Sequence, residues 1–88
     1  MSADRSHFVY VLECSDGSFY TGYTTDVERR IEEHNAGAGA KYTRGRTPVE
    51  VLHTERFGSR SAAMKREHEI KGFSRARKER LVEGRGSA

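Results

Sequence analysis

A hairpin signal near the start of the chain constrains its fold most. Residues 7–14 (HFVYVLEC) and 18–24 (SFYTGYT) are rich in β-branched and aromatic residues, and Asp16-Gly17 lies between them. Such residues favour strands, and an Asp-Gly pair between two strand-like segments is typical of a tight turn. The sequence therefore predicts two antiparallel strands joined by a short loop.

Two hairpin registers are compatible with this turn, and they place the tyrosines differently. A two-residue type I′ turn pairs Tyr10 with Tyr23 and leaves Tyr20 on the opposite face of the sheet. A three-residue loop with Gly17 in the left-handed conformation pairs Tyr10 with Gly22, so that Tyr10 and Tyr20 share a face. The alternation of apolar residues mildly favours the second register. Local turn chemistry leaves both open.

A capping box predicts the start of the first helix. Thr25 fits the N-cap position and Glu28 lies three residues after it. The helix is expected to run to about Ala36 and to stop at Gly37, because glycine is the usual residue after a helix end.

Arg30 and His34 are the candidate functional residues of this helix. At 100° per residue His34 lies on one stripe with Val27 and Ile31, and Arg30 lies at its margin. Residues four apart are neighbours on a helix, so both side chains could reach one anionic group over the sheet. Spacing alone favours the more ordinary interpretation, in which Arg30 follows the core edge and His34 interacts with the helix dipole.

The second half of the chain predicts a strand and two more helices. A basic, glycine-rich loop leads to Pro48, which fits the first position of a strand with the sequence VEVLHTERF. Ser59 or Ser61 can cap the next helix, which ends at Gly72. Ser74 then caps a last helix, expected to reach about residue 82.

Length and composition limit the chain to one small domain. Its 88 residues are 34% hydrophobic and 33% charged, yet the apolar residues fall in periodic groups. We expect a single α+β domain over residues 1–83, in the order β-β-α-β-α-α, with 84–88 as a disordered tail. No apolar run approaches the length of a membrane span and the first residues are polar, which predicts a cytoplasmic protein without a membrane partner.

Charge is distributed unevenly along the chain. Residues 1–40 carry 3 basic and 7 acidic side chains, a net −4, whereas residues 41–88 carry 13 and 6, a net +7. A positive surface attracts nucleic acid through its phosphates. The loop AKYTRGR also interleaves an aromatic residue with basic ones, which suits phosphate contacts and base stacking, although a solvated loop is the commoner meaning of a charge run. The predicted nucleic-acid-binding residues are Lys41, Tyr42, Arg44, Arg46 and Lys71.

Glu67 occupies a helix position where an apolar residue is expected. It lies on one stripe with Ala63 and Ile70. A shielded carboxylate needs a cation, because an unpaired buried charge is costly. The two interpretations are a salt bridge to an arginine such as Arg30 and a ligand of Mg²⁺. The pattern by itself does not favour the metal.

In their order and spacing these residues resemble the GIY-YIG nuclease domain. Its two signature motifs are matched by Phe8-Val9-Tyr10 and Tyr20-Thr21-Gly22. Its helix arginine and histidine fall on Arg30 and His34, and its metal-binding glutamate falls on Glu67 in KREHEIK. The chain apart from its tail is similar to the small stand-alone bacterial members, including GAKYTRGRTPV before the third strand.

The resemblance implies a three-stranded antiparallel sheet flanked by helices, and hydrolysis of DNA phosphodiester bonds with one Mg²⁺ or Mn²⁺ ion, in DNA repair or processing. Tyr10 is then the general base or a proton-relay phenol and Tyr20 its partner. Arg30 binds the scissile phosphate, His34 supports proton transfer and Glu67 binds the metal. An ordinary tyrosine has a pKa of about 10, so a phenolate base would need positive charge nearby.

Three departures from the family pattern support an alternative function. Phe8 stands where the family name has glycine, Tyr23 follows YTG where repair-type members tend to carry lysine, and no asparagine follows the last basic helix. The alternative is a non-catalytic nucleic-acid-binding or accessory module on the same fold. The small stand-alone members that this chain resembles lack the DNA-recognition domain of larger relatives, which implies that specificity comes from the basic half of the chain or from a partner protein. The sequence leaves open the choice between DNA and RNA and the oligomeric state.

Overall fold

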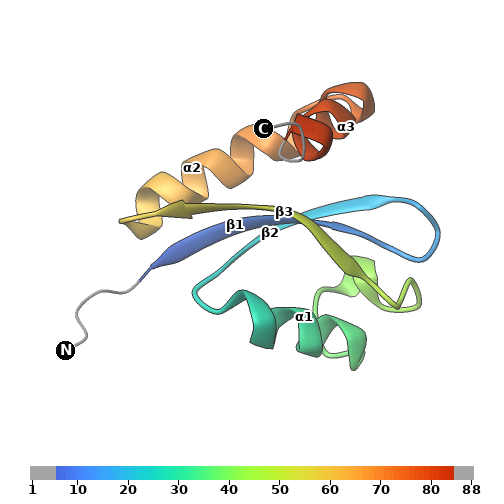
Figure 1. Cartoon of the computed structure of the whole chain (residues 1–88). Coiled ribbons are helices and arrows are strands. Elements are labelled where there is room, and N and C mark those ends of the chain that lie inside the picture. Colours follow the sequence, from blue (N-terminus) through green and yellow to red (C-terminus); the bar gives the residue numbers. More distant parts are fainter. Residues whose placement is uncertain (1–5, 85–88) are drawn as a thin grey trace.

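The computed structural model describes residues 6–84, in which a three-stranded sheet lies between helices (Figure 1). The strands are β1 (His7–Glu13), β2 (Phe19–Thr24) and β3 (Glu50–Phe57), and the helices are α1 (Val27–Asn35), α2 (Arg60–Lys71) and α3 (Arg75–Gly84). A short 3₁₀ turn, η1 (Lys41–Thr43), lies in the loop after α1. The sheet is antiparallel with the strand order β2-β1-β3. The predicted element order and the α+β fold are confirmed.

β1 and β2 pair in the register that places both tyrosines on one face. Tyr10 lies opposite Gly22, and Tyr20 lies two residues before that glycine. The backbone hydrogen bonds at the turn enclose a three-residue loop, in which Gly17 has φ +84°. Glycine adopts this left-handed conformation without the steric cost that other residues incur. The two-residue turn is therefore not formed.

Alternate residues of β1 contribute to two separate cores, because successive side chains of a strand point to opposite faces. Figure 1 shows α1 on one side of the sheet and α2 with α3 on the other. The core beneath α2 contains Val9, Val11, Ala63 and Ile70. The core on the α1 side contains Tyr10, Leu12, Cys14 and Val49. Tyr10 is thus part of the packing and, as shown below, of a polar site.

The first helix is capped by a different residue from the one predicted. The Asp26 carboxylate accepts a hydrogen bond from the Arg29 N–H at 3.1 Å, and the Thr24 hydroxyl accepts one from the Asp26 N–H. The predicted cap, Thr25 with Glu28, is wrong. Aspartate is at least as good an N-cap as threonine, and here it is already held in place by the threonine two residues before it.

The remaining helix ends agree with the sequence pattern except at the C-terminus. Ser59, not Ser61, caps α2, and the Ser74 hydroxyl accepts a hydrogen bond at the start of α3. α3 continues to Gly84, a residue that was predicted to belong to the tail. The rest of that tail lies outside the described residues. No helix within residues 6–84 is long and apolar enough to cross a membrane.

Candidate active site

Tyr10 extends from the central strand over the neighbouring strand β2. A side chain at Gly22 would overlap the Tyr10 hydroxyl and ring, so only glycine leaves room for the phenol at this point. Tyr10 is 1% exposed. Its hydroxyl lies 2.9 Å from Nε2 of His34 on α1. The glycine of the second motif therefore allows the tyrosine of the first motif to reach α1.

His34 connects Tyr10 to the loop that follows α1. The imidazole is fully buried, and its Nδ1 lies 2.7 Å from the Thr43 hydroxyl oxygen. Burial and the charge of Arg30 lower the pKa of His34 below its ordinary value. The ordinary pKa is about 6.5, so His34 is neutral at pH 7.

Tyr20 lies in the same cluster, as the register requires. Its ring centroid is 6.4 Å from that of Tyr10 and 5.5 Å from that of His34. Tyr42 of η1 stacks on Tyr20 with centroids 5.8 Å apart and an interplanar angle of 25°. Four rings, from β1, β2, α1 and η1, thus meet on the α1 side of the sheet.

Arg30 lies close enough to Tyr10 for its charge to act on the hydroxyl. Burial and the charge of Glu67 raise the pKa of Tyr10, and the interaction with Arg30 lowers that pKa. Burial is the largest effect, so the pKa of Tyr10 lies above its usual value. The Arg30 guanidinium also pairs with Glu33 at 2.9 Å. Tyr10 consequently remains a protonated phenol at neutral pH.

Glu67 lies on α2, on the other side of the sheet from α1 (Figure 1), and its charge has a small upward effect on the pKa of Tyr10. Its side chain is 13% exposed, whereas Ala63 and Ile70 on the same stripe are fully buried. The carboxylate pairs with Lys71 at 3.2 Å, one turn further along the helix. A salt bridge between Glu67 and Arg30, one of the two sequence interpretations, is not formed.

The donor set around Glu67 decides which metal ion could bind there. The described residues contain no group of three or more His, Cys, Asp or Glu side chains that could hold a metal ion. Zn²⁺ normally requires three or four such ligands. Mg²⁺ is typically bound by one or two carboxylates together with substrate phosphates and water. A single glutamate, with the remaining ligands supplied by water and substrate, fits Mg²⁺ or Mn²⁺ and does not fit zinc.

Comparison with known proteins places these residues in a family context. The model of the GIY-YIG catalytic domain matches residues 6–80 of the chain. This chain belongs to the GIY-YIG family. The stretches that match its two signature motifs, residues 8–10 and 20–22, lie on the paired strands β1 and β2, which bring Tyr10 and Tyr20 to one face.

Relatives of this GIY-YIG protein are similar over nearly the whole chain. It is 73% identical over 82 residues to a UPF0213 protein of Natronomonas pharaonis, which covers 93% of this chain and 94% of that protein. The solution NMR structure of a UPF0213 protein from Bacillus halodurans has a TM-score of 0.61 at 56% identity and covers 93% of this chain and 87% of that one. An E. faecalis protein, also solved by NMR, has a TM-score of 0.62 at 51% identity and covers 96% and 90%.

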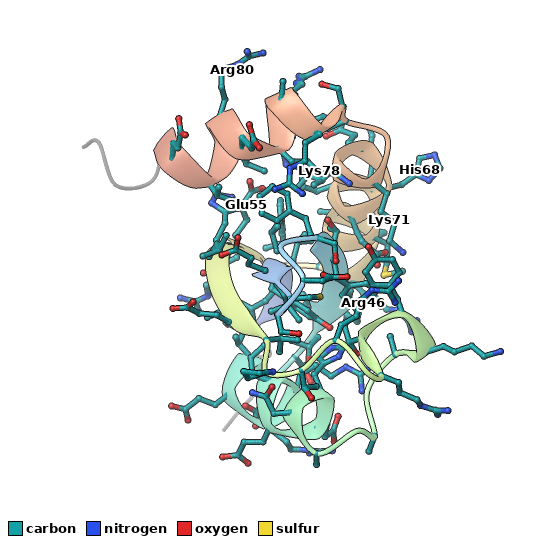
Figure 2. The ribbon with its side chains drawn as sticks, turned by 90° about the vertical axis from the view of Figure 1, so that its right-hand side faces the viewer. Arg46, Glu55, His68, Lys71, Lys78 and Arg80 are labelled. Carbon is teal, nitrogen blue, oxygen red and sulfur yellow. The ribbon has the colours of Figure 1, made fainter. Side chains whose placement is uncertain are left out.

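The predicted nucleic-acid-binding residues of the GIY-YIG domain differ in their surroundings. Lys41 and Arg44 are exposed and form no ion pair with another residue in 6–84. Arg46 is engaged: it pairs with Asp16 at 3.0 Å and lies 4.3 Å above the centre of the Tyr42 ring. In Figure 2, Lys71 lies between Arg46 below it and Lys78 of α3 above it.

Sequence patterns do not indicate two residues that support this cluster of side chains. Thr43 is fully buried against His34, and a side chain at Gly39 would overlap the His34 imidazole. Both lie in a loop whose composition indicates only exposure and flexibility. The stretch GAKYTRGRTPV, which carries part of the family resemblance, contains Gly39 and Thr43 but gives no hint that the loop folds back onto α1.

Proposed function

We propose that this protein is a metal-dependent endonuclease, a hydrolase that cuts DNA phosphodiester bonds in DNA repair or processing. The observation that carries the proposal is the position of Tyr10. Its hydroxyl is hydrogen-bonded to a neutral His34 and is subject to the charges of Arg30 and Glu67, which come from different helices. Packing alone does not require a buried phenol to bond a histidine and to lie under the charges of side chains from two helices.

A proton relay suits this geometry better than a free phenolate. Burial holds the pKa of Tyr10 above its ordinary value, so the phenolate is scarce at pH 7. The attacking water can instead give its proton to the Tyr10 oxygen while the phenol gives its own proton to Nε2 of His34, 2.9 Å away. His34 is then the proton acceptor of the reaction.

The other residues bind and orient the phosphate. Arg30 keeps about a third of its side chain exposed and can exchange its contact with Glu33 for a phosphate oxygen. Glu67 would hold Mg²⁺ or Mn²⁺ once its contact with Lys71 is released. When bound, such an ion stabilises the negative charge that develops on the phosphoryl oxygens.

Two ion pairs support a second candidate, a non-catalytic nucleic-acid-binding module. Glu67 is neutralised by Lys71, and Arg30 by Glu33, so both groups have partners within the protein. Such a module binds phosphates through Lys41 and Arg44, with strong salt dependence, and has no metal-dependent turnover.

Cleavage by variants of two glutamates on α2 distinguishes the candidates. Wild type, Glu67→Gln and Glu69→Gln are each incubated with Mg²⁺ or Mn²⁺ and labelled DNA in single-stranded, duplex, flapped or branched form. Labelled RNA serves as a comparison substrate. Glu69 is the matched control, because it lies on the same helix, is exposed and pairs with Arg66. We expect Glu67→Gln to lose cleavage by a factor of about 100 or more and to retain binding. Equal rates for both variants would contradict the assigned metal ligand, and binding without cutting by the wild type would favour the module.

A further inference from the structure

A chain of hydrogen bonds connects the Ala40 carbonyl, Thr43, His34 and Tyr10, and the carbonyl at its end fixes the direction of the bonds. The Thr43 hydroxyl donates its one proton to the Ala40 carbonyl at 2.9 Å, and a carbonyl can only accept. The Thr43 oxygen must therefore accept from the other neighbour. That neighbour is Nδ1 of His34 at 2.7 Å, so Nδ1 carries the imidazole proton.

This protonation state determines what the other imidazole nitrogen can do. A neutral imidazole has one N–H donor and one acceptor nitrogen. With the proton on Nδ1, Nε2 of His34 has a free lone pair and accepts from the Tyr10 hydroxyl. The opposite tautomer would turn Nε2 into a donor and would place an acceptor nitrogen against a hydroxyl whose proton is already used.

The surroundings leave water little opportunity to replace Thr43. His34 and Thr43 both have 0% exposure, and the turn η1 holds the threonine in place through the Ala40 carbonyl. Gly39 lies against the imidazole and has no side chain that would push the loop away. The backbone of the loop can therefore come close enough for the threonine to reach Nδ1.

We propose that Thr43 is a positioning residue that fixes the tautomer of His34 and so keeps Nε2 available for the Tyr10 proton. The consequence for catalysis rests on the nuclease function proposed above, whereas the tautomer itself does not. Thr43 touches neither substrate nor metal in this scheme. It acts only through His34.

Nitrogen NMR of the metal-free, DNA-free protein tests the assignment directly. The chain has four histidines, and the His34 ring signals are identified by their absence in His34→Gln. In wild type we expect a protonated Nδ1 and an unprotonated Nε2. Thr43→Val keeps the shape but removes the acceptor, and is expected to shift the proton to Nε2. Thr43→Ser keeps the hydroxyl and is expected to restore the wild-type pattern.

Each outcome of these measurements is decisive. A wild-type protein with the proton on Nε2, or a folded Thr43→Val protein that keeps it on Nδ1, would overturn the proposal. The wild-type spectrum needs no variant to fold. In cleavage assays we expect Thr43→Val to be about 10- to 100-fold slower, by analogy with hydrogen-bond partners that orient metal-bound histidines, and Thr43→Ser to be restored. Wild-type protein that shows the expected tautomer but cuts no DNA would refute the nuclease and leave the tautomer assignment standing.

Discussion

Replacing Tyr10 by phenylalanine removes one oxygen atom from the centre of the site. The ring keeps its packing, but Nε2 of His34 loses the hydroxyl that donates to it at 2.9 Å. Tyr10 and His34 are 1% and 0% exposed, so water does not easily replace the lost donor. An unsatisfied buried acceptor costs about 1–3 kcal/mol. We therefore expect urea unfolding to show a free energy of unfolding lower by that amount.

The effect on cleavage should be much larger than the effect on stability. Loss of a general acid–base group slows a reaction by about 10²- to 10⁴-fold. In a labelled-DNA assay with Mg²⁺, at a temperature where the variant is fully folded, Tyr10→Phe is expected to fall in this range. DNA binding should remain, because the phosphate contacts assigned to Arg30 do not involve the Tyr10 hydroxyl.

Tyr23→Phe is the matched control on the same hairpin. The Tyr23 hydroxyl also contacts a histidine, His7 Nδ1 at 2.7 Å, but it lies on the other face of the sheet and is partly exposed. This variant loses one partly exposed hydrogen bond, so it should lower stability by about 0.5–1 kcal/mol and leave cleavage unchanged. If Tyr10→Phe cut DNA at the wild-type rate, the proton relay would be refuted. Equal slowing by both substitutions would attribute the loss to the hairpin and not to one hydroxyl.

Three further measurements probe other parts of the site. Gly22→Ala places a methyl group against the Tyr10 phenol and should lower the free energy of unfolding by about 1–3 kcal/mol and slow cleavage. Gly58→Ala, where the space is open, should do neither. Equal effects of the two substitutions would contradict the close approach of Tyr10 to Gly22. Burial lowers the pKa of His34 in the folded protein, so at low pH the histidine of the unfolded chain is protonated more readily than the folded one. The stability that the neutral imidazole contributes is therefore complete above about pH 6.5 and is lost as the pH falls. Urea titrations of His34→Gln should show a shallower loss at low pH, and a slope identical to wild type would count against a buried neutral imidazole. Lys71→Met removes the partner of Glu67, and an exposed ion pair of this kind contributes about 0–1 kcal/mol. We therefore expect Lys71→Met to bind Mn²⁺ up to about fivefold more tightly, as measured by water relaxation. Unchanged affinity would show that the pair does not compete with the metal.

The loop after α1 forms one wall of the site because the hairpin turn holds it. Arg46 pairs with Asp16, and its carbonyl accepts from the Ser15 N–H at 2.8 Å. Hydrogen bonds from Ser18, and then the pair with Arg46, lower the pKa of Asp16 to about 2, so this carboxylate is charged at neutral pH. Arg46 thereby keeps Tyr42 stacked on Tyr20. A residue predicted to bind nucleic acid is, in the free protein, a structural link between two segments.

Much of the fold could be predicted because it depends on neighbours in the chain. Strand-forming residues around Asp16-Gly17 indicate the hairpin, and serines at 59 and 74 mark the starts of two helices. The same local reasoning fails where two local solutions compete. Thr25 and Asp26 are both acceptable caps, and only the surrounding hydrogen bonds decide for Asp26.

The sequence by itself determined the candidates, Tyr10, Tyr20, Arg30, His34 and Glu67, through their order and spacing. Only the tertiary structure decided how they act together. Thr43 reaches His34 across nine residues, and Arg46 reaches Asp16 across 30. The physical reason is that hydrogen-bond partners and burial arise when segments distant in the chain pack against each other. A periodic pattern records which face a side chain occupies, but it carries no information about the group that faces it.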